Sequence, residues 1–316
     1  MRVLVASPPY PLEMVRELLA PTGATVEAGR PPWSGDDVAG LLIWERVTIE
    51  DIDRLPNLRV IATCSVGYDH IDLEAARARG IWICHVPDYC LDEMADSTIA
   101  LALALVRGVV FLDRSVRAGG WDDHAAGPLE PVSDTRLGII GFGRIGRAVA
   151  TRALALGMEV WASDPEVADA DMSLVGVRGV RLNELLEGCG VVSLHVPLSD
   201  ATAGLIGAQE LALMPRGAFL INTARAGLVD QAALMAALDS GRLGGAALDV
   251  LTDEPPTPSR PAPQHPRLIV TPHAAWYSPH AEREVYRRAA LAVRSVLEGG
   301  KPDGAVVTPP LSRDSA

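Results

Sequence analysis

The sequence predicts an α/β protein with two doubly wound parallel sheets. Two observations carry this prediction: short apolar runs alternate with longer helical stretches, and the alternation occurs twice along the 316 residues. Apolar runs without a polar face indicate parallel strands that helices cover on both sides. The length also suits two domains of ordinary size.

The first series of elements occupies the N-terminal third of the chain. Strands are expected at residues 3–6, 41–43, 60–62 and 81–83, with a helix at 12–19. The segment from Asp92 to Arg107 is rich in Ala and Leu and contains neither Gly nor Pro. Such a composition predicts a long, buried helix.

The second series starts at Arg136. Strands are expected at residues 137–140, 159–162, 191–194, 218–221, 246–250 and 268–270, and helices at 144–156 and 282–297. The Gly- and Pro-containing segment 117–131 is the expected linker between the two units. The last helix follows the second unit, and its return to the first unit is an open alternative.

Charge and hydropathy exclude several classes of partner. A formal net charge of −12 argues against nucleic acid as the main partner. The longest apolar run, Ile99 to Val106, is far too short to span a bilayer. The segment from Met1 to Ala6 has the pattern of a strand and not of a signal peptide. We therefore expect a cytoplasmic protein without membrane contact.

Lysine is almost absent from the chain, because Lys301 is the only one. Schiff-base chemistry needs a lysine in the core of the site, and a P-loop needs one beside its Ser or Thr. The sequence therefore excludes these classes, together with the lysine-dependent β-hydroxyacid dehydrogenases.

The cysteines and histidines give no metal-binding pattern. Cys64, Cys84, Cys90 and Cys189 have no C-x-x-C spacing, and the seven histidines do not cluster with them. We expect reduced, mostly buried thiols and no metal site.

A glycine fingerprint opens the second series. Gly141, Gly143 and Gly146 form a G-x-G-x-x-G that follows an apolar strand and precedes an amphipathic helix, with Arg144 and Ile145 between the last two glycines. This context is typical of a Rossmann domain, in which the glycines allow a tight turn and close approach of the pyrophosphate. The helix N-terminus then offers unpaired N–H groups to the phosphates.

Asp164 lies after the next expected strand. A carboxylate there can accept hydrogen bonds from the adenosine ribose hydroxyls and would repel a 2′-phosphate. The predicted cofactor is therefore NAD and not NADP; the alternative is a glycine-rich turn with a helix-capping Asp164.

Arg225, Glu254 and His273 each follow an expected strand of the second unit. Ligands of open α/β sheets bind outside the carboxyl ends of the strands, so these side chains should face one crevice. Hydride transfer needs an acid/base on the oxygen, which a histidine supported by a carboxylate supplies. A guanidinium can grip a carboxylate and polarise the adjacent carbonyl. Each residue alone is more often structural or solvated; their joint occurrence indicates catalysis.

In combination, these motifs resemble the D-isomer-specific 2-hydroxyacid dehydrogenases, over residues 41 to 297. The resemblance rests on Ser65 to Asp72, Gly141 to Gly146, Asn222 to Arg225, Leu248 to Val250 with Glu254-Pro255, and Thr271 to His273. Within the family, Ala95 to Thr98 and Ala274 to Ser278 look most like the C-terminal binding protein branch, which implies that Trp276 lies near the substrate.

The resemblance implies a flavodoxin-like substrate domain at 1–98 and 279–316, and an NAD-binding domain at 99–278. It implies that amides around Val66 and Gly67, with Tyr68 beside them, bind the substrate carboxylate between the domains, as an anion nest could. It also implies a homodimer built on the Asp92 to Arg107 helix. The remaining residues expected beside the cofactor are His195, Val196, Pro197, Thr223, Ala224 and Asp249, with His195 outside the proton transfer.

Several positions depart from the family pattern. Ala226 stands where glycine is usual, and His70 and His85 stand where asparagine is common. The loop that contains Arg46 is also unusual, so the substrate cannot be carried over from the family. We hypothesise that Arg46 contacts a second anionic group of the substrate; a solvated arginine is the alternative.

The predicted activity is the NAD-dependent interconversion of a small 2-keto acid and its D-2-hydroxy acid. One alternative is a dehydrogenase of an unusual anion, such as phosphite or a phosphonate, on the same scaffold. Another is an NAD-sensing, corepressor-like binding protein.

Overall fold

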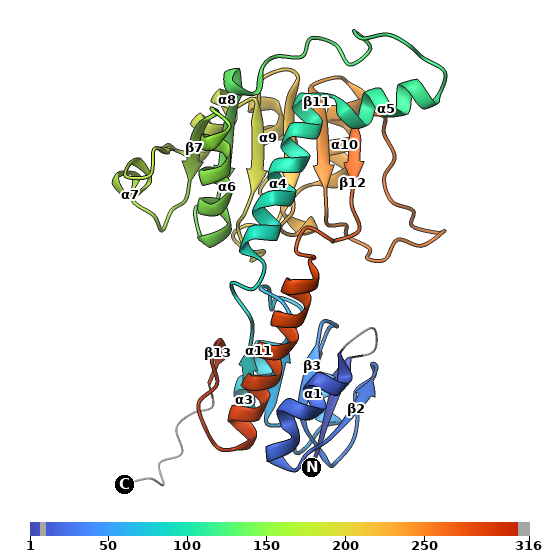
Figure 1. The fold of residues 1–316 in the computed structure, drawn as a ribbon, viewed down its shortest axis with the longest axis vertical. Coiled ribbons are helices and arrows are strands. Elements are labelled where there is room, and N and C mark those ends of the chain that lie inside the picture. Colours follow the sequence, from blue (N-terminus) through green and yellow to red (C-terminus); the bar gives the residue numbers. More distant parts are fainter. Residues whose placement is uncertain (7–10, 309–316) are drawn as a thin grey trace. The chain divides into compact units, whose positions relative to one another are not determined.

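The computed structural model describes residues 1–6 and 11–308, and its contacts divide the chain into two units. Unit 1 comprises residues 1–89 and 278–316, and unit 2 comprises residues 90–277. The last eight residues of the expected 279–316 segment lie outside the described part of the chain. Figure 1 gives the positions of the elements within each unit.

Unit 1 is built on a six-stranded sheet with the order β13-β5-β4-β3-β1-β2. The strands are β1 (Arg2–Ala6), β2 (Thr25–Gly29), β3 (Val38–Ile43), β4 (Val60–Thr63), β5 (Trp82–Cys84) and β13 (Ala305–Val307). The five N-terminal strands pair in parallel, and β13 is antiparallel to β5. The paired strands β1, β3 and β4 are almost entirely buried, as expected for parallel strands covered on both faces.

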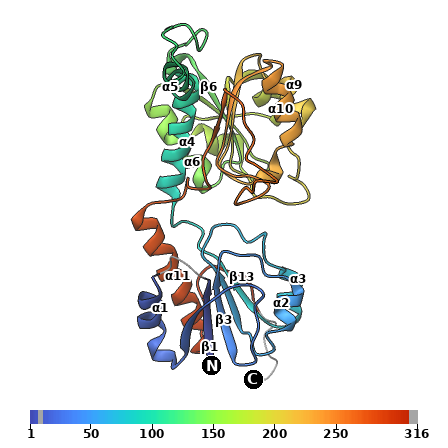
Figure 2. The same cartoon turned by 90° about the vertical axis from the view of Figure 1, so that its right-hand side faces the viewer.

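Helices cover both faces of this sheet. The helices are α1 (Leu12–Leu19), α2 (Ile49–Asp53), α3 (Leu73–Ala78) and α11 (Pro279–Leu297), with a short 3-10 helix at 20–22. Figure 2 shows α1 and α11 on one face and α2 and α3 on the other. Since α11 contributes buried side chains to unit 1, the last helix returns to the N-terminal unit, the alternative that the sequence left open.

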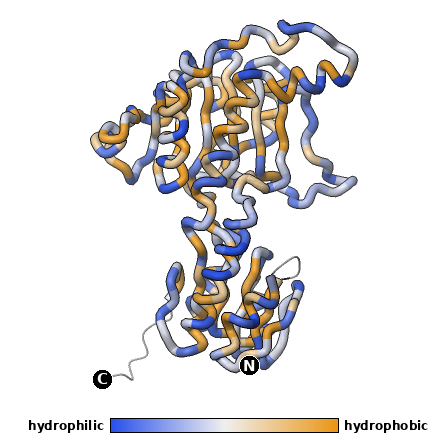
Figure 3. Tube along the Cα trace, viewed as in Figure 1, coloured by the Kyte–Doolittle hydropathy of each residue, from blue (hydrophilic) through white to orange (hydrophobic). Residues whose placement is uncertain are grey.

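Unit 2 is built on a fully parallel seven-stranded sheet with the order β12-β11-β10-β9-β6-β7-β8. The strands are β6 (Arg136–Ile140), β7 (Glu159–Ser163), β8 (Arg178–Gly179), β9 (Val191–Leu194), β10 (Ala218–Asn222), β11 (Leu243–Leu248) and β12 (Leu268–Val270). Figure 3 shows the hydrophobic residues concentrated along these strands. The predicted strands are therefore present, although β11 ends at Leu248 and leaves the predicted final residues, 249 and 250, in the following loop.

Two helical layers enclose the sheet of unit 2. One hydrophobic cluster joins α4 (Leu91–Val106) and α6 (Arg144–Ala155) to one face, and another joins α8 (Leu182–Gly188), α9 (Ala208–Leu213) and α10 (Gln231–Asp239) to the other. The remaining helices are α5 (Val109–Arg117), α7 (Asp169–Ser173) and short 3-10 turns at 132–134 and 226–228.

The predicted linker at 117–131 is wrong, because this segment lies inside unit 2. The physical reason is that α4 buries Ala95, Ile99 and Ala102 in the core of unit 2, so the chain must change units before this helix and not after it. The division between Tyr89 and Cys90 likewise differs from the boundary expected after residue 98, which would cut α4.

Two further findings concern the whole chain. All four cysteines lie among the described residues, are buried and form no disulfide, as the sequence predicts. Within the described ranges, no single helix has the length and apolar composition of a membrane span. Helices α4 and α5 have that length and composition only when they are taken together, and the pair is bent by 59°.

Candidate active site

The predicted cofactor and catalytic residues of unit 2 follow the carboxyl ends of its parallel strands. Gly141 follows β6, Asp164 follows β7, and His195 follows β9. The strand order turns back between β6 and β9, since the chain runs from β6 to β7 on one side and to β9 on the other. Such a switch point is where open α/β sheets bind their ligands.

The three glycines of the fingerprint differ in the space that the structure leaves for a side chain. Gly141 has a φ of 94°, and a Cβ there would lie 2.7 Å from the His195 carbonyl carbon. A Cβ on Gly146 would overlap the carbonyl oxygen of Gly141. A Cβ on Gly143, which is exposed at the start of α6, would meet no atom of the described residues within 4 Å. The space over Gly143, which we call the cradle, is therefore open and is not used by the protein's own packing.

The N-terminus of α6 faces this cradle with unsatisfied donors. Gly143 is its N-cap and supplies no side-chain hydrogen bond, and Arg144 at the first helical position is exposed. Asp164 is held beside it: one carboxylate oxygen accepts the Phe142 amide at 2.7 Å, and the other accepts the Glu166 amide at 2.8 Å. These features fit the pyrophosphate and ribose of a dinucleotide, because a carboxylate can accept further hydrogen bonds at each oxygen.

His195 lies on the loop between β9 and α9. Its amide donates to the Ile140 carbonyl at 2.7 Å, and its Nε2 lies 2.9 Å from the Ser193 hydroxyl. Burial lowers the pKa of His195 to about 4, so the imidazole is neutral at pH 7. That His195 takes no part in proton transfer stays a prediction.

His273 and Glu254 form a direct pair. Nδ1 of His273 lies 2.6 Å from Oε2 of Glu254, and Oε1 of Glu254 accepts the Leu251 amide at 2.6 Å. Burial opposes ionisation of Glu254. The hydrogen bonds from His273 and Leu251, with the charges of His273 and Arg225, outweigh burial and lower the pKa of Glu254. The carboxylate is thus ionised at neutral pH and engages Nδ1 of the imidazole, which leaves Nε2 for another partner.

Arg225 lies close enough to Glu254 for its charge to act on that carboxylate. Its loop is fixed by Asn222, which is 1% exposed: the amide nitrogen of Asn222 donates to the Arg225 carbonyl at 2.7 Å, and its oxygen accepts the Ala224 amide at 3.0 Å. The structure therefore brings together the three residues that the sequence proposed as a catalytic set.

The loop that carries His273 is organised around Asp249. The Asp249 carboxylate is 1% exposed and accepts hydrogen bonds from the Thr271 hydroxyl at 2.5 Å and from the Ala274 and Ala275 amides, each at 2.9 Å. Its carbonyl accepts the His273 amide at 2.8 Å. His273 has a φ of 53°, a left-handed conformation that residues other than Gly rarely adopt. The hydrogen bonds to Asp249 hold this conformation in place.

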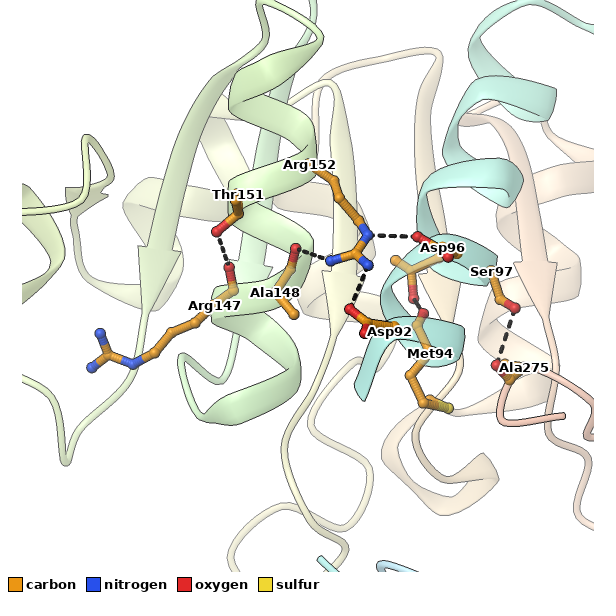
Figure 4. Close-up of polar contacts among 10 residues, drawn as sticks. Asp92, Met94, Asp96, Ser97, Arg147, Ala148, Thr151, Arg152 and Ala275 are labelled. Carbon is orange, nitrogen blue, oxygen red and sulfur yellow. Dashed lines mark hydrogen bonds and ion pairs between the residues drawn. The ribbon is translucent and has the colours of Figure 1, made fainter. Parts of the chain in front are cut away.

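Helix α4 also contacts the loops that carry His273 and Arg225. Figure 4 shows the Ser97 hydroxyl donating to the Ala275 carbonyl, a bond of 3.0 Å, and Arg152 of α6 reaching Asp92 and Asp96 of α4 at 2.7 and 2.6 Å. The hydroxyl of the next residue, Thr98, lies 3.2 Å from that of Thr223. Thus α4 connects α6 to the loops that carry Arg225 and His273.

Unit 1 carries the second predicted group, on the loop after β4. The Ser65 hydroxyl donates to the Gly67 carbonyl at 2.5 Å, and His85 Nδ1 lies 2.7 Å from the Val66 carbonyl oxygen. The His85 ring packs edge-on against Tyr68 with centroids 5.2 Å apart. Within the described residues, the Val66 and Gly67 amides donate no hydrogen bond. The loop thus presents two N–H groups suited to an anion.

The other expected site residues have the following places. Val196 and Pro197 follow His195 in the loop after β9. The carbonyl oxygen of Ala224 accepts a hydrogen bond from the Arg225 guanidinium at 2.8 Å. Ile145 is half-buried in α6, and Arg46 is exposed after β3. Trp276 packs edge-on against Tyr277 in unit 2, with centroids 5.6 Å apart. Their assigned contacts with cofactor or substrate stay predictions.

Several supporting residues escaped the sequence analysis as parts of the site. Asn222, Ser97, Thr98 and His85 were visible only as pieces of motifs, and their roles depend on partners far away in the chain. Asn222 gave one local signal, since an Asn directly after a strand often binds its own loop backbone.

A parallel sheet with a dinucleotide cradle at its switch point, beside an imidazole–carboxylate–guanidinium set, defines a nicotinamide-dependent dehydrogenase. Comparisons with known proteins identify the family. The family model for the D-isomer specific 2-hydroxyacid dehydrogenase, NAD binding domain, matches residues 99–275. The chain therefore belongs to the D-isomer specific 2-hydroxyacid dehydrogenase family, and it is an NAD-dependent 2-hydroxyacid dehydrogenase.

Individual relatives agree. A glyoxylate reductase from Thermofilum pendens is 36% identical over 84% of this chain and 79% of its own length. A glycerate dehydrogenase from Methylorubrum extorquens is 38% identical over 81% of each chain. The structure of D-lactate dehydrogenase from Aquifex aeolicus, complexed with NAD and lactic acid, matches with a TM-score of 0.86 and 29% identity over 98% of this chain and 100% of that one. The likeness to the C-terminal binding protein branch stays a prediction.

The glycine geometry predicts opposite effects for two alanine variants. Gly143→Ala should fold with a stability within about 0.5 kcal/mol of wild type, because the added Cβ meets no neighbour, yet weaken NADH binding about tenfold or more by entering the cradle. Gly146→Ala should cost about 2 kcal/mol or more, because its Cβ overlaps the Gly141 carbonyl. Chemical denaturation and NADH fluorescence titration measure both; unchanged NADH affinity in Gly143→Ala would contradict this assignment.

The depressed pKa of His195 predicts an acid-sensitive fold. An exposed imidazole titrates near 6.5 but His195 only near 4, so the unfolded chain binds the additional proton between these values. Stability should be full above pH 6.5 and decline as the pH falls toward 4, with His195 responsible for about 2 kcal/mol at pH 5. Denaturation at pH 7.5 and 5 should show a smaller loss in His195→Gln than in wild type or in the exposed control His124→Gln.

Proposed function

We propose that the protein interconverts a small 2-keto acid, such as glyoxylate or hydroxypyruvate, and its D-2-hydroxy acid. The observation that carries the proposal is the 2.6 Å pair of His273 and Glu254 within electrostatic range of Arg225. The names of the relatives, a glyoxylate reductase and a glycerate dehydrogenase, support small substrates.

The cofactor would bind along the carboxyl edge of unit 2. We assign the pyrophosphate to the cradle over Gly143 and the N-terminus of α6, and the adenosine ribose to Asp164. The neighbouring residues of the strand-end loops would line the remainder: Gly141, Arg144, Ile145, Gly146, His195, Val196, Pro197, Thr223, Ala224 and Asp249. When bound, NADH would supply the hydride for keto acid reduction and NAD+ would accept it in the reverse direction.

His273 would move the proton. Its Nδ1 is bonded to Glu254, so Nε2 is the nitrogen that can give a proton to the keto oxygen or take one from the hydroxyl. Glu254 stays ionised at neutral pH and stabilises the imidazolium that forms after proton uptake. Arg225 would hold the substrate carboxylate and polarise its carbonyl.

Unit 1 would supply the other contacts to the carboxylate. The Val66 and Gly67 amides are suited to this because their carbonyls are occupied by side chains while their N–H groups point to no described acceptor. Tyr68 would lie beside them, and Trp276 of unit 2 would border the substrate. No structural observation favours phosphite, a phosphonate or a corepressor role over this assignment.

We also propose that the protein is cytoplasmic and forms a homodimer through α4 and its continuation α5. The support is an exposed apolar group in this region: Val109, Val116 and Trp121 are 56%, 47% and 91% exposed. Burying such apolar side chains against a second copy removes them from water and so stabilises the dimer.

The catalytic assignment predicts a selective loss of turnover. His273→Gln should lower kcat for keto acid reduction about 100-fold or more, and Glu254→Gln about tenfold or more, because proton transfer or its charge support is lost. NADH affinity should stay within about twofold of wild type, since neither side chain is assigned to the dinucleotide. His124→Gln is the matched control. Near-normal kcat in His273→Gln with glyoxylate and hydroxypyruvate would remove the assignment; phosphite with NAD tests the alternative substrate.

The dimer proposal predicts a mass of twice 33.4 kDa in sedimentation equilibrium. Val116→Asp should shift the protein toward monomer, because a charge would be buried at the interface. Leu174→Asp, which alters a side chain that is 84% exposed elsewhere in unit 2, should leave the mass unchanged. A monomeric wild type would contradict the proposal.

A further inference from the structure

The loop after β3 lies beside the loop that carries the Val66 and Gly67 amides. Strands β3 and β4 are parallel neighbours in which Ile43 pairs with Thr63, and the Cys64 amide donates to the Ile43 carbonyl at 2.8 Å. Residues 44–46 and 65–68 therefore leave the sheet of unit 1 at the same edge, one strand apart.

The β3 loop is fixed in place. The Trp44 indole donates to the Tyr286 hydroxyl at 3.0 Å, and the two rings meet edge to face with centroids 6.4 Å apart. Tyr286 is buried in α11, so this contact ties the loop to the core of unit 1. Oε2 of Glu45 accepts the Trp44 amide at 3.1 Å, which folds the carboxylate back over the end of its own strand.

The charge of Glu45 reaches the neighbouring loop. Burial raises the pKa of the Cys64 thiol, and the Glu45 carboxylate raises it further. Cys64 directly precedes Ser65, whose hydroxyl holds the Gly67 carbonyl. A half-buried negative charge thus lies beside the segment that presents the two free amides. Arg46, the next residue along, is exposed.

We propose that Glu45 determines substrate charge: it restricts the site to 2-keto acids whose single anionic group is the carboxylate bound by the Val66 and Gly67 amides. Glyoxylate, which has no C3, is accepted, and so is a 2-keto acid whose C3 carries only hydrogens or a hydroxyl or amine that can donate a hydrogen bond. A phosphate or second carboxylate is rejected, because a like charge at this edge is repelled. The inference rests on the proposed function and opposes the hypothesis that Arg46 binds a second anionic group.

The test uses the full chain with NADH and four keto acids: glyoxylate, hydroxypyruvate, oxaloacetate and 3-phosphohydroxypyruvate. In Glu45→Gln, kcat/KM for the last two should rise about tenfold or more, while that for glyoxylate stays within about twofold, because only the charge is removed. Gln keeps an oxygen for the Trp44 amide. Glu45→Asp keeps the charge and should retain the rejection, and the exposed Glu74→Gln is the control for net charge.

Distinct outcomes separate the inference from the function. If wild type reduces glyoxylate or hydroxypyruvate but Glu45→Gln leaves the ratio of monoanionic to dianionic substrates unchanged, the role of Glu45 is overturned and the proposed function stands. The same holds if Arg46→Gln abolishes a wild-type preference for the dianionic acids. If wild type binds NADH but reduces none of the four acids, both are overturned.

Discussion

The buried carboxylate of Asp249 is the constraint on which the geometry of the proposed catalytic residues depends. It gathers the Thr271 hydroxyl and two successive amides after His273, and so stabilises a left-handed residue at the end of β12. A carboxylate removed from water needs such donors, and here they come from the one loop that must be held. The position of the His273 imidazole against Glu254 is a consequence of this bonding.

The same principle operates at the neighbouring strand ends. Asn222 fixes the loop of Arg225, Asp164 fixes the fingerprint turn through the Phe142 amide, and Ser65 fixes the loop of Val66 and Gly67. In each case a short polar side chain satisfies loop backbone that no longer belongs to the sheet. The neighbouring polar groups form hydrogen bonds within the protein. The Val66 and Gly67 amides and the N-terminus of α6 therefore stay available to a ligand.

The rigidity of these loops also depends on α4. Through Ser97 and Thr98 it contacts the loops after β12 and β10, and through Asp92 and Asp96 it meets Arg152 of α6. The ion pairs are partly exposed, so they contribute little stability by themselves. These ion pairs instead help to fix α6 relative to the loops after β10 and β12, because all three contact the same helix, α4.

The sequence by itself determined the two parallel sheets, the fingerprint turn, and the set of Arg225, Glu254 and His273, because strand hydrophobicity and strand-end chemistry are local properties. The linker at 117–131 was wrong because Gly and Pro mark every loop, whereas a domain boundary depends on which core a helix such as α4 buries its side chains in. Only the tertiary structure decided that Asp249 organises the His273 loop and that Glu45 lies beside the amide loop, since both depend on hydrogen bonds and charges between residues that are distant in sequence.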